Sequence, residues 1–265
     1  MPEADLQVAL EAARAGAAEV ESGLDRRVEV RYKADADPVT EVDHHSEMAI
    51  LEMISRHRPR DPVVGEERGG RLPEEGRVWL VDPLDGTTNF VHGFPWISIS
   101  VALWIGNTPA VGVVVDVTTG DEYTAVAGGG AHANRSPIGV SSLEDFGEAL
   151  VVTGFPYRRR ERLEICDSRF RRVLGTAQGV RRLGAASLDM CMVARGRMDG
   201  YWEEDLPPWD MGAGTLLVTE AGGTVSDRSG GPIGPSGGFV VASNGRIHQQ
   251  FLDTLGEPSL PEQLL

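Results

Sequence analysis

A short segment in the first third of the chain, Val78–Phe90, constrains both the fold and the chemistry. Its first four residues are apolar, which predicts a strand buried within a sheet. We expect this strand to end at Asp82, because Pro83 has no backbone N–H and bends the chain. The bend would bring Asp82 and Asp85 together, and the glycine and threonines that follow offer free N–H groups and hydroxyls. Because convergent carboxylates suit Mg²⁺ and successive N–H groups suit an anionic oxygen, the segment predicts a metal and a phosphate held together.

The composition is that of an ordinary globular protein and argues against several kinds of function. The chain has 265 residues, 41% of them hydrophobic, and its net charge of -15 argues against nonspecific binding of nucleic acid. No apolar run reaches the roughly 18 residues that a membrane-spanning helix needs, and no secretory signal pattern is present. The two cysteines, Cys166 and Cys191, have no metal-ligand spacing, so we expect a reducing, cytoplasmic setting.

Periodicity along the chain predicts a mixture of helices and strands. An apolar stripe predicts a helix over residues 4–22, and Thr40 or Asp43 could cap a second helix that continues to about residue 57. The other segments predicted to be helical are residues 158–174, 186–194, 211–221 (with Gly222 after its end) and 247–255. The segments predicted to be strands are residues 63–64, 78–81, several within 97–127, and 151–153, 201–202 and 240–242. This order fits a layered α/β or α+β architecture.

The residues from Asp82 to Phe90, Asp-Pro-Leu-Asp-Gly-Thr-Thr-Asn-Phe, resemble the signature of the inositol monophosphatase family. Members of this family are Mg²⁺-dependent, lithium-sensitive phosphatases of small phosphorylated molecules. The resemblance covers about residue 30 to residue 245 and implies the αβαβα sandwich of the sugar phosphatases. It implies one domain over residues 1–265, with two intimate halves that divide near residues 140–150. It also implies two or three Mg²⁺ ions per site and a homodimer.

Further carboxylates are needed, since two alone bind a metal weakly. Glu66 follows the short strand near residue 63, and from the sequence alone it also fits an exposed loop acid. Asp210 precedes a predicted helix, where an aspartate is a routine N-cap. The resemblance favours metal binding by both, because Gly-Glu66-Glu and Trp-Asp210-Met-Gly-Ala-Gly are similar to two family motifs. The metal ligands that it implies are Glu66, Asp82, the carbonyl of Leu84, Asp85 and Asp210.

The resemblance also implies how water is activated. The sequence Thr40-Glu-Val-Asp43 is similar to a family motif whose aspartate pairs with the first threonine after Asp-Gly, here Thr87. Asp43 and Thr87 are therefore the expected catalytic residues, together with Glu66, near which the attacking water is polarised. Lys33 lies at the spacing seen in bacterial members and is expected to contribute electrostatically, although an exposed loop lysine fits the sequence as well.

The substrate would be held by this segment and by later ones. The sequence Gly184-Ala185-Ala186 aligns with the family stretch that contacts the inositol ring. The sequence Asp199-Gly-Tyr-Trp-Glu203 resembles a motif whose glutamate binds sugar hydroxyls, although Glu203 alone also fits a surface acid. The expected substrate contacts are Asp85, Gly86, Thr87, Gly184, Ala185, Ala186, Glu203 and Asp210.

The expected reaction is hydrolysis of a small polyol phosphate, most directly myo-inositol 1-phosphate, by activated water without a phosphoenzyme. Histidinol phosphate, a phosphorylated amino alcohol, is an alternative substrate, because Pro38-Val-Thr40 resembles that branch of the family and Glu203 suits an amine. Fructose 1,6-bisphosphate is another alternative substrate. Ala185 stands where animal members of the family have threonine, and this departure weakens the argument for inositol phosphate as the preferred substrate. A noncatalytic role is also open, since the run Arg158–Arg162 fits a docking patch, an RNA contact or a solvated helix face.

Overall fold

The computed structural model describes residues 2–24, 29–34 and 37–256. The helices are α1 (Pro2–Gly23), α2 (Glu41–His57), α3 (Thr87–His92), α4 (Leu163–Thr176), α5 (Ala186–Ala194), α6 (Pro208–Glu220) and α7 (His248–Leu255). A seven-stranded sheet has the spatial order β3 (Val63–Gly65), β4 (Arg77–Asp85), β5 (Ser98–Ile105), β6 (Thr108–Asp116), β7 (Glu122–Val126), β8 (Gly130–Ala133) and β9 (Ser136–Pro137). A five-stranded sheet has the order β11 (Gly179–Arg181), β10 (Leu150–Thr153), β12 (Gly200–Leu206), β14 (Gly238–Ser243) and β13 (Thr224–Ser226). A hairpin pairs β1 (Val30–Ala34) with β2 (Asp37–Thr40).

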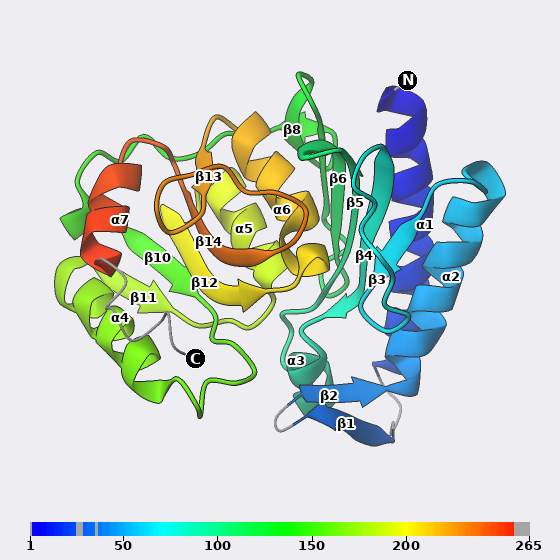
Figure 1. Ribbon diagram of the computed structural model, residues 1–265, viewed down its shortest axis with the longest axis horizontal. Coiled ribbons are helices and arrows are strands. Elements are labelled where there is room, and N and C mark those ends of the chain that lie inside the picture. Colours follow the sequence, from blue (N-terminus) through cyan, green and yellow to red (C-terminus); the bar gives the residue numbers. More distant parts are fainter. Residues whose placement is uncertain (1, 25–28, 35–36, 257–265) are drawn as a thin grey trace.

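These elements form five alternating layers of helices and sheets (Figure 1). On the right of the view, α1 and α2 cover one face of the seven-stranded sheet. The helices α5 and α6 lie between the two sheets, and α4 and α7 cover the outer face of the five-stranded sheet on the left. The order helix, sheet, helix, sheet, helix confirms the predicted αβαβα sandwich. None of the helices described has the length and apolar character that a membrane crossing requires.

The strand β5 illustrates why the larger sheet lies inside the molecule. Successive side chains of a strand point to opposite faces, and both faces of this strand are apolar. Ile99, Val101 and Leu103 pack into the core under α1 and α2. Ala102 and Trp104 face the other core, which contains α5 and α6. The alternation of Ile99, Val101 and Leu103 with smaller or polar residues predicted this strand, and the structure shows that the residues between them are buried as well.

Several predicted elements are confirmed with their boundaries. The helix over residues 186–194 is α5. Thr40 is the N-cap of α2, and it forms a capping box with Asp43: Thr40 Oγ1 accepts from Val42 N, and Asp43 accepts from Thr40 N. Gly222 follows α6 with a φ of 89°, as expected for a glycine after a helix end.

Three predictions need correction. The strand β4 does not end at Asp82 but continues to Asp85. The helix expected from Arg158 begins only at Leu163, because five consecutive charged residues provide no apolar stripe and residues 158–162 form successive turns instead. The helix expected from Met211 already begins at Pro208, which is favoured in the first turn of a helix. The short helix α3 and the β1–β2 hairpin were not predicted.

Candidate active site

Asp82 and Asp85 line the same cavity because β4 is bulged between them. In a regular strand, residues three apart point to opposite faces of the sheet. Here Asp82 pairs with Ser100 of β5 and Asp85 pairs with Ser98, so β4 accommodates one extra residue. Asp82 Oδ1 accepts a hydrogen bond from Leu84 N at 3.0 Å within the bulge. The predicted convergence therefore comes from a bulge inside the strand and not from the end of the strand.

Four carboxylates from three parts of the chain converge on one small cavity of about 20 Å³. Glu66 follows β3, Asp82 and Asp85 belong to β4, and Asp210 belongs to α6. Burial, followed by repulsion from the other three carboxylates, raises the pKa of Asp82 well above its ordinary value. Burial and the same kind of repulsion also raise the pKa of Asp210. Without a neighbouring cation, burial and mutual repulsion therefore disfavour the charged forms of these acids.

The position of Asp210 before a predicted helix also allowed it to be an N-cap, but Asp210 is not the N-cap of α6. Pro207 occupies the cap position and makes no side-chain hydrogen bond there. Because the helix begins earlier than expected, Asp210 lies within its first turn, where the helix dipole favours a negative charge. Its carboxylate is thus not used for capping and lines the cavity.

Lys33 supplies positive charge beside these carboxylates. Its Nζ donates to Glu66 Oε1 at 2.8 Å and also to Glu67. Burial raises the pKa of Glu66 to about 7, although the Lys33 ammonium opposes the shift. Burial lowers the pKa of Lys33, but the two glutamates more than offset this effect and the net shift is upward. Lys33 thus lies in strand β1 beside the site and not in a loop, and its side chain is 28% exposed while it pairs with Glu66 and Glu67.

The cavity suits a divalent cation that prefers oxygen ligands. Its lining offers carboxylates, and the lining residue Leu84 brings a backbone carbonyl, whereas histidine and cysteine do not contribute. In the described part of the chain, no three His, Cys, Asp or Glu side chains are gathered closely enough to form a closed ligand set. The feature that fits a metal is the excess of acids, since four carboxylates line the cavity and one lysine pairs with one of them, and a bound cation would favour their ionised forms.

Glu47 of α2, which the sequence did not single out, holds the turn that carries the first carboxylate of the cavity. Its Oε1 accepts hydrogen bonds from Glu67 N and Arg68 N, both at 3.1 Å. A β-carbon at Gly65 would clash with this oxygen, so the glycine permits the close approach. A signal was present in the sequence, since Glu47 lies four residues after Asp43 and so on the same face of the helix.

The structure brings Asp43 and Thr87 together from α2 and the start of α3. Thr87 Oγ1 lies 2.9 Å from Asp43 Oδ1 and 3.1 Å from Leu84 O. Asp43 Oδ2 accepts from Thr40 N at 2.8 Å and from Thr40 Oγ1 at 2.7 Å, which fixes the carboxylate. Both side chains of the pair are buried. When Thr87 donates to Asp43, its oxygen keeps lone pairs that can accept a hydrogen from water.

The turn before α3 can hold an anionic oxygen. The first N–H groups of a helix have no acceptor within the helix, and Gly86, Thr87 and Thr88 all line the larger pocket next to the cavity. Gly86 has a φ of 94°, in the left-handed region that favours glycine. A β-carbon at this position would lie 2.9 Å from Trp96 O, so the close approach also requires glycine.

Asp85 of β4 also binds the first residues of α5. Its carboxylate accepts hydrogen bonds from Ala186 N at 3.1 Å, Ser187 N at 2.7 Å and Ser187 Oγ at 2.6 Å. Asn89, which the sequence analysis left without a role, donates to Trp96 O at 2.8 Å and to Leu183 O at 2.9 Å. Two side chains of the Asp82–Phe90 segment thus fix the loop before α5 and the start of α5 against the turn before α3.

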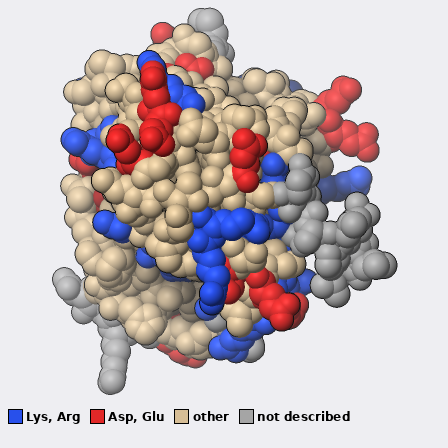
Figure 2. Space-filling view, turned by 90° about the vertical axis from the view of Figure 1, so that its left-hand side faces the viewer, with Lys and Arg blue, Asp and Glu red and all other residues tan. Residues whose placement is uncertain are grey.

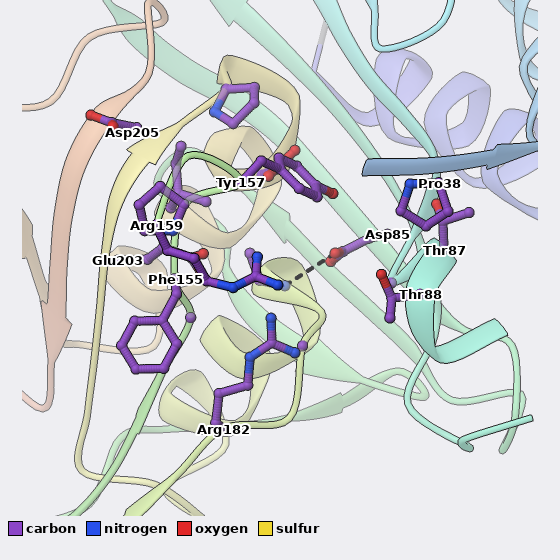
Figure 3. A pocket seen from close by; sticks show the side chains of 18 of the residues that line it. Pro38, Asp85, Thr87, Thr88, Phe155, Tyr157, Arg159, Arg182, Glu203 and Asp205 are labelled. Carbon is purple, nitrogen blue, oxygen red and sulfur yellow. Dashed lines mark hydrogen bonds between the residues drawn. The ribbon is translucent and has the colours of Figure 1, made fainter. Parts of the chain in front are cut away.

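The larger pocket, of about 530 Å³, lies between the β2–α3 side and the segments that follow β10, β11 and β12 (Figure 3). Gly184 and Ala186 line this pocket. Ala185 does not, because its side chain is buried against Gly86. This expected substrate contact therefore lies behind the pocket wall.

Glu203 lies in the pocket wall opposite Asp85 (Figure 3) and is not a surface acid. Tyr201 Oη donates to Glu203 Oε2 at 2.7 Å. Burial raises the pKa of Glu203 to about 7, although the hydrogen bond from Tyr201 and the charge of Arg182 oppose the shift. The glutamate can therefore both accept and donate hydrogen bonds near neutral pH, which suits the hydroxyls of a sugar or polyol.

Comparison with known proteins agrees with this geometry. The profile of the Inositol monophosphatase family matches residues 1–258. The chain is 41% identical to an inositol-1-monophosphatase of Synechocystis, over 94% of this chain and 88% of the relative. It is 39% identical to a Nus factor SuhB of Pseudomonas aeruginosa, over 98% of both chains. The structure of an inositol monophosphatase from Anabaena superposes with a TM-score of 0.88 at 38% identity, covering 98% of both chains. The chain therefore belongs to the inositol monophosphatase family and is a phosphatase, a phosphoric monoester hydrolase of the inositol-phosphate type.

Proposed function

We propose that the protein hydrolyses the phosphate monoester of a small polyol, most directly myo-inositol 1-phosphate, in the presence of Mg²⁺. The observation that carries the proposal is the convergence of four carboxylates on one cavity beside the buried Asp43–Thr87 pair. The pocket next to this cavity has the volume and the hydrogen-bonding groups that a sugar or polyol needs. Family membership and the inositol-1-monophosphatase of Synechocystis support the same substrate class.

Metal binding would use oxygen atoms that the fold already holds in place. The proposed ligands of two or three Mg²⁺ ions are Glu66, Asp82, the carbonyl of Leu84, Asp85 and Asp210. When bound, the metal supplies charge that neutralises phosphoryl oxygens and favours deprotonation of the attacking water. Hydrogen bonds from Ser187 to Asp85, and from the turn after Gly65 to Glu47, keep the ligands oriented before substrate arrives.

The residues of the chain would direct the attack. Thr87 accepts a hydrogen from the attacking water while it donates to Asp43, so a proton can pass from the water to the carboxylate. The N–H groups of Gly86 and Thr87 hold phosphoryl oxygens, which aligns phosphorus with the water oxygen. The water oxygen bonds to phosphorus and the ester P–O bond breaks. The leaving alkoxide takes up a proton from solvent, and Asp43 releases to solvent the proton that it took from the attacking water. No covalent phosphoenzyme is formed.

The polyol would be held by Glu203, Gly184 and Ala186 on the opposite wall of the pocket. We also propose that the protein is lithium-sensitive and forms a homodimer, on the basis of family membership. A reducing, cytoplasmic location is proposed from the two cysteines, which are both buried and unbridged.

The test is phosphate release with Mg²⁺ from inositol 1-phosphate, histidinol phosphate, fructose 1,6-bisphosphate and a nucleoside monophosphate, each with and without lithium. We expect Mg²⁺-dependent release that is highest with inositol 1-phosphate and is abolished by Asp82→Asn. Asp227→Asn is the matched control, because Asp227 binds Ser229 and Gly231 in a loop outside both pockets. A preference for histidinol phosphate would contradict inositol 1-phosphate as the substrate. If no ester released phosphate, the proposed phosphatase activity itself would be contradicted.

A partner-binding role is the second candidate, because several relatives carry the name Nus factor SuhB. The charged run Arg158–Arg162 would be its contact surface. Arg162 is paired with Glu204 and Asp205, however, so it is less available to a partner. On the face over α4 and α7, Lys and Arg side chains are interspersed with Asp and Glu (Figure 2). Asp82→Asn distinguishes the two roles, since it removes hydrolysis but leaves this surface unchanged.

A further inference from the structure

Arg169 is buried, although arginine is a residue that is almost never fully buried unless it is paired. It lies on the inner face of α4 with Cys166 and Val173, and its side chain is 3% exposed. Its partner is Glu204 of β12, whose side chain is 6% exposed. Because removing two charges from water is costly, a buried ion pair is often no more stabilising than apolar residues of similar volume. Stability alone therefore does not explain why this pair lies inside the protein.

The pair lies at a bulge in β12. Between Glu203 and Leu206, β12 has two residues where the facing stretch of β14 has one. The two residues are Glu204 and Asp205. Asp205 has a φ of 55°, in the left-handed region that residues other than glycine seldom adopt. The ion pair of Glu204 ties this irregular stretch to the inner face of α4.

Arg169 contacts both strands at the bulge. It pairs with Glu204 of β12, and its guanidinium also lies over the ring of Phe239, 5.1 Å from the ring centroid. Phe239 is the residue of β14 that faces the bulge. A second arginine, Arg162, lies 3.3 Å from Glu204 Oε2 and also pairs with Asp205. Since a guanidinium is planar and binds a carboxylate in a fixed geometry, these contacts restrict the orientation of the bulge.

The orientation of the bulge matters for the polyol, because Glu203 is the residue directly before it. A bulge bends its strand and redirects neighbouring side chains. The Glu203 carboxylate lies so close to the backbone of Gly154 that a β-carbon there would clash with both of its oxygens. The space for this carboxylate in the pocket wall is therefore narrow, and a small rotation of β12 would displace it from the pocket.

We propose that the Arg169–Glu204 pair positions the polyol-binding wall: it holds the bulge of β12 so that Glu203 keeps its place in the pocket. This inference rests on the proposed phosphatase function. Arg169 does not line the pocket, so its guanidinium acts on the substrate through another residue. The pair thus governs the preference for a leaving group that carries hydroxyls, and it does so through Glu203.

The experiment measures kcat/KM for myo-inositol 1-phosphate and for cyclohexyl phosphate, which has the same ring without the other hydroxyls. We expect the wild type to prefer the inositol ester by about 10- to 100-fold, the range for hydrogen bonds to a charged acceptor. The double variant Arg169→Met/Glu204→Leu removes both charges together, so that no unpaired charge is buried and the fold is retained. It should reduce the preference about tenfold, through a higher KM for the inositol ester, and leave cyclohexyl phosphate hydrolysis unchanged.

The matched control is Arg171→Met/Asp167→Leu. These two residues form an exposed ion pair on the same helix, with 2.7 Å between Arg171 Nε and Asp167 Oδ2. The control should keep the wild-type preference. Urea unfolding of each variant shows whether the fold is retained. If Arg169→Met/Glu204→Leu does not fold, Arg169→Lys replaces it, because lysine keeps the charge but not the planar guanidinium, and it should reduce the preference less strongly.

The deciding measurement repeats the double variant in a Glu203→Ala background. Effects that act through one residue do not add, so loss of the pair should then cause no further change in the preference. A further decrease would show that the pair acts on the substrate by another route and would overturn the inference. A wild-type preference near one, or an unchanged preference in the double variant, would overturn it as well and leave the proposed function intact. If the wild type hydrolysed neither ester, the proposed function and this inference would both be refuted.

Discussion

Thr87→Val is the change that most directly tests how the site activates water. Valine keeps the shape of threonine but removes the hydroxyl that lies 2.9 Å from Asp43 Oδ1. Asp43 would retain its two hydrogen bonds from Thr40 and lose the third. If Thr87 orients the attacking water, hydrolysis must slow far more than the loss of one buried hydrogen bond would explain.

The change should reduce both the stability of the fold and the rate of turnover, by different amounts. A buried hydrogen bond to a charged group contributes about 1.5–3 kcal/mol to stability, so unfolding should become easier by this amount. Loss of a positioned proton acceptor reduces turnover by about 100- to 10,000-fold, which corresponds to about 3–5 kcal/mol in the barrier. Because Asp43 and Thr87 act on one proton, the double variant Asp43→Asn/Thr87→Val should be no slower than the slower single variant.

The assay is kcat for inositol 1-phosphate at saturating Mg²⁺, with urea unfolding of the same samples. Thr215→Val is the matched control, since Thr87 and Thr215 are both 6% exposed and Thr215 Oγ1 donates to Met211 O at 2.8 Å inside α6. We expect this control to lose about 1 kcal/mol of stability and little turnover. Turnover of Thr87→Val within about threefold of the control, against the expected 100-fold or more, would refute the proposed role.

Three other changes test the supporting groups. Glu47→Gln weakens the acceptor that holds the turn after Gly65, so the Mg²⁺ concentration for half-maximal activity should rise about 10- to 100-fold; an unchanged value would contradict the positioning role. The pKa of Glu203 is near 7 when folded and 4.5 in its ordinary state, so the folded protein binds more protons between these values and its stability falls as pH rises from 4.5 to 7. Glu203→Gln should remove up to about 3 kcal/mol of this loss, as measured by urea unfolding at pH 5 and pH 8. Saturating Mg²⁺ should raise the unfolding free energy by about 3 kcal/mol at 100 times its Kd, and equal stabilisation of Asp82→Asn would argue against a metal at this cavity.

The order of helices and strands could be predicted from local patterns. The apolar alternation in β5 and the apolar run of α5 have the right period and length, and both elements are where they were expected. The start of α4 could not be located in this way, because the charged residues before it favour no single local structure. The helix α3 was missed because a helix of 6 residues is too short to show a period.

The sequence by itself determined which residue types gather near β4, because the nine residues from Asp82 to Phe90 contain two carboxylates, a glycine and two threonines in fixed spacing. Only the tertiary structure decided how they face one another. The bulge in β4 depends on pairing with β5, the support of the Glu66 turn by Glu47 depends on packing of α2, and the entry of Arg159 into the pocket depends on distant segments. Local patterns reflect neighbours along the chain, whereas a site is assembled by contacts between residues far apart in sequence, and those contacts leave little trace in any short segment.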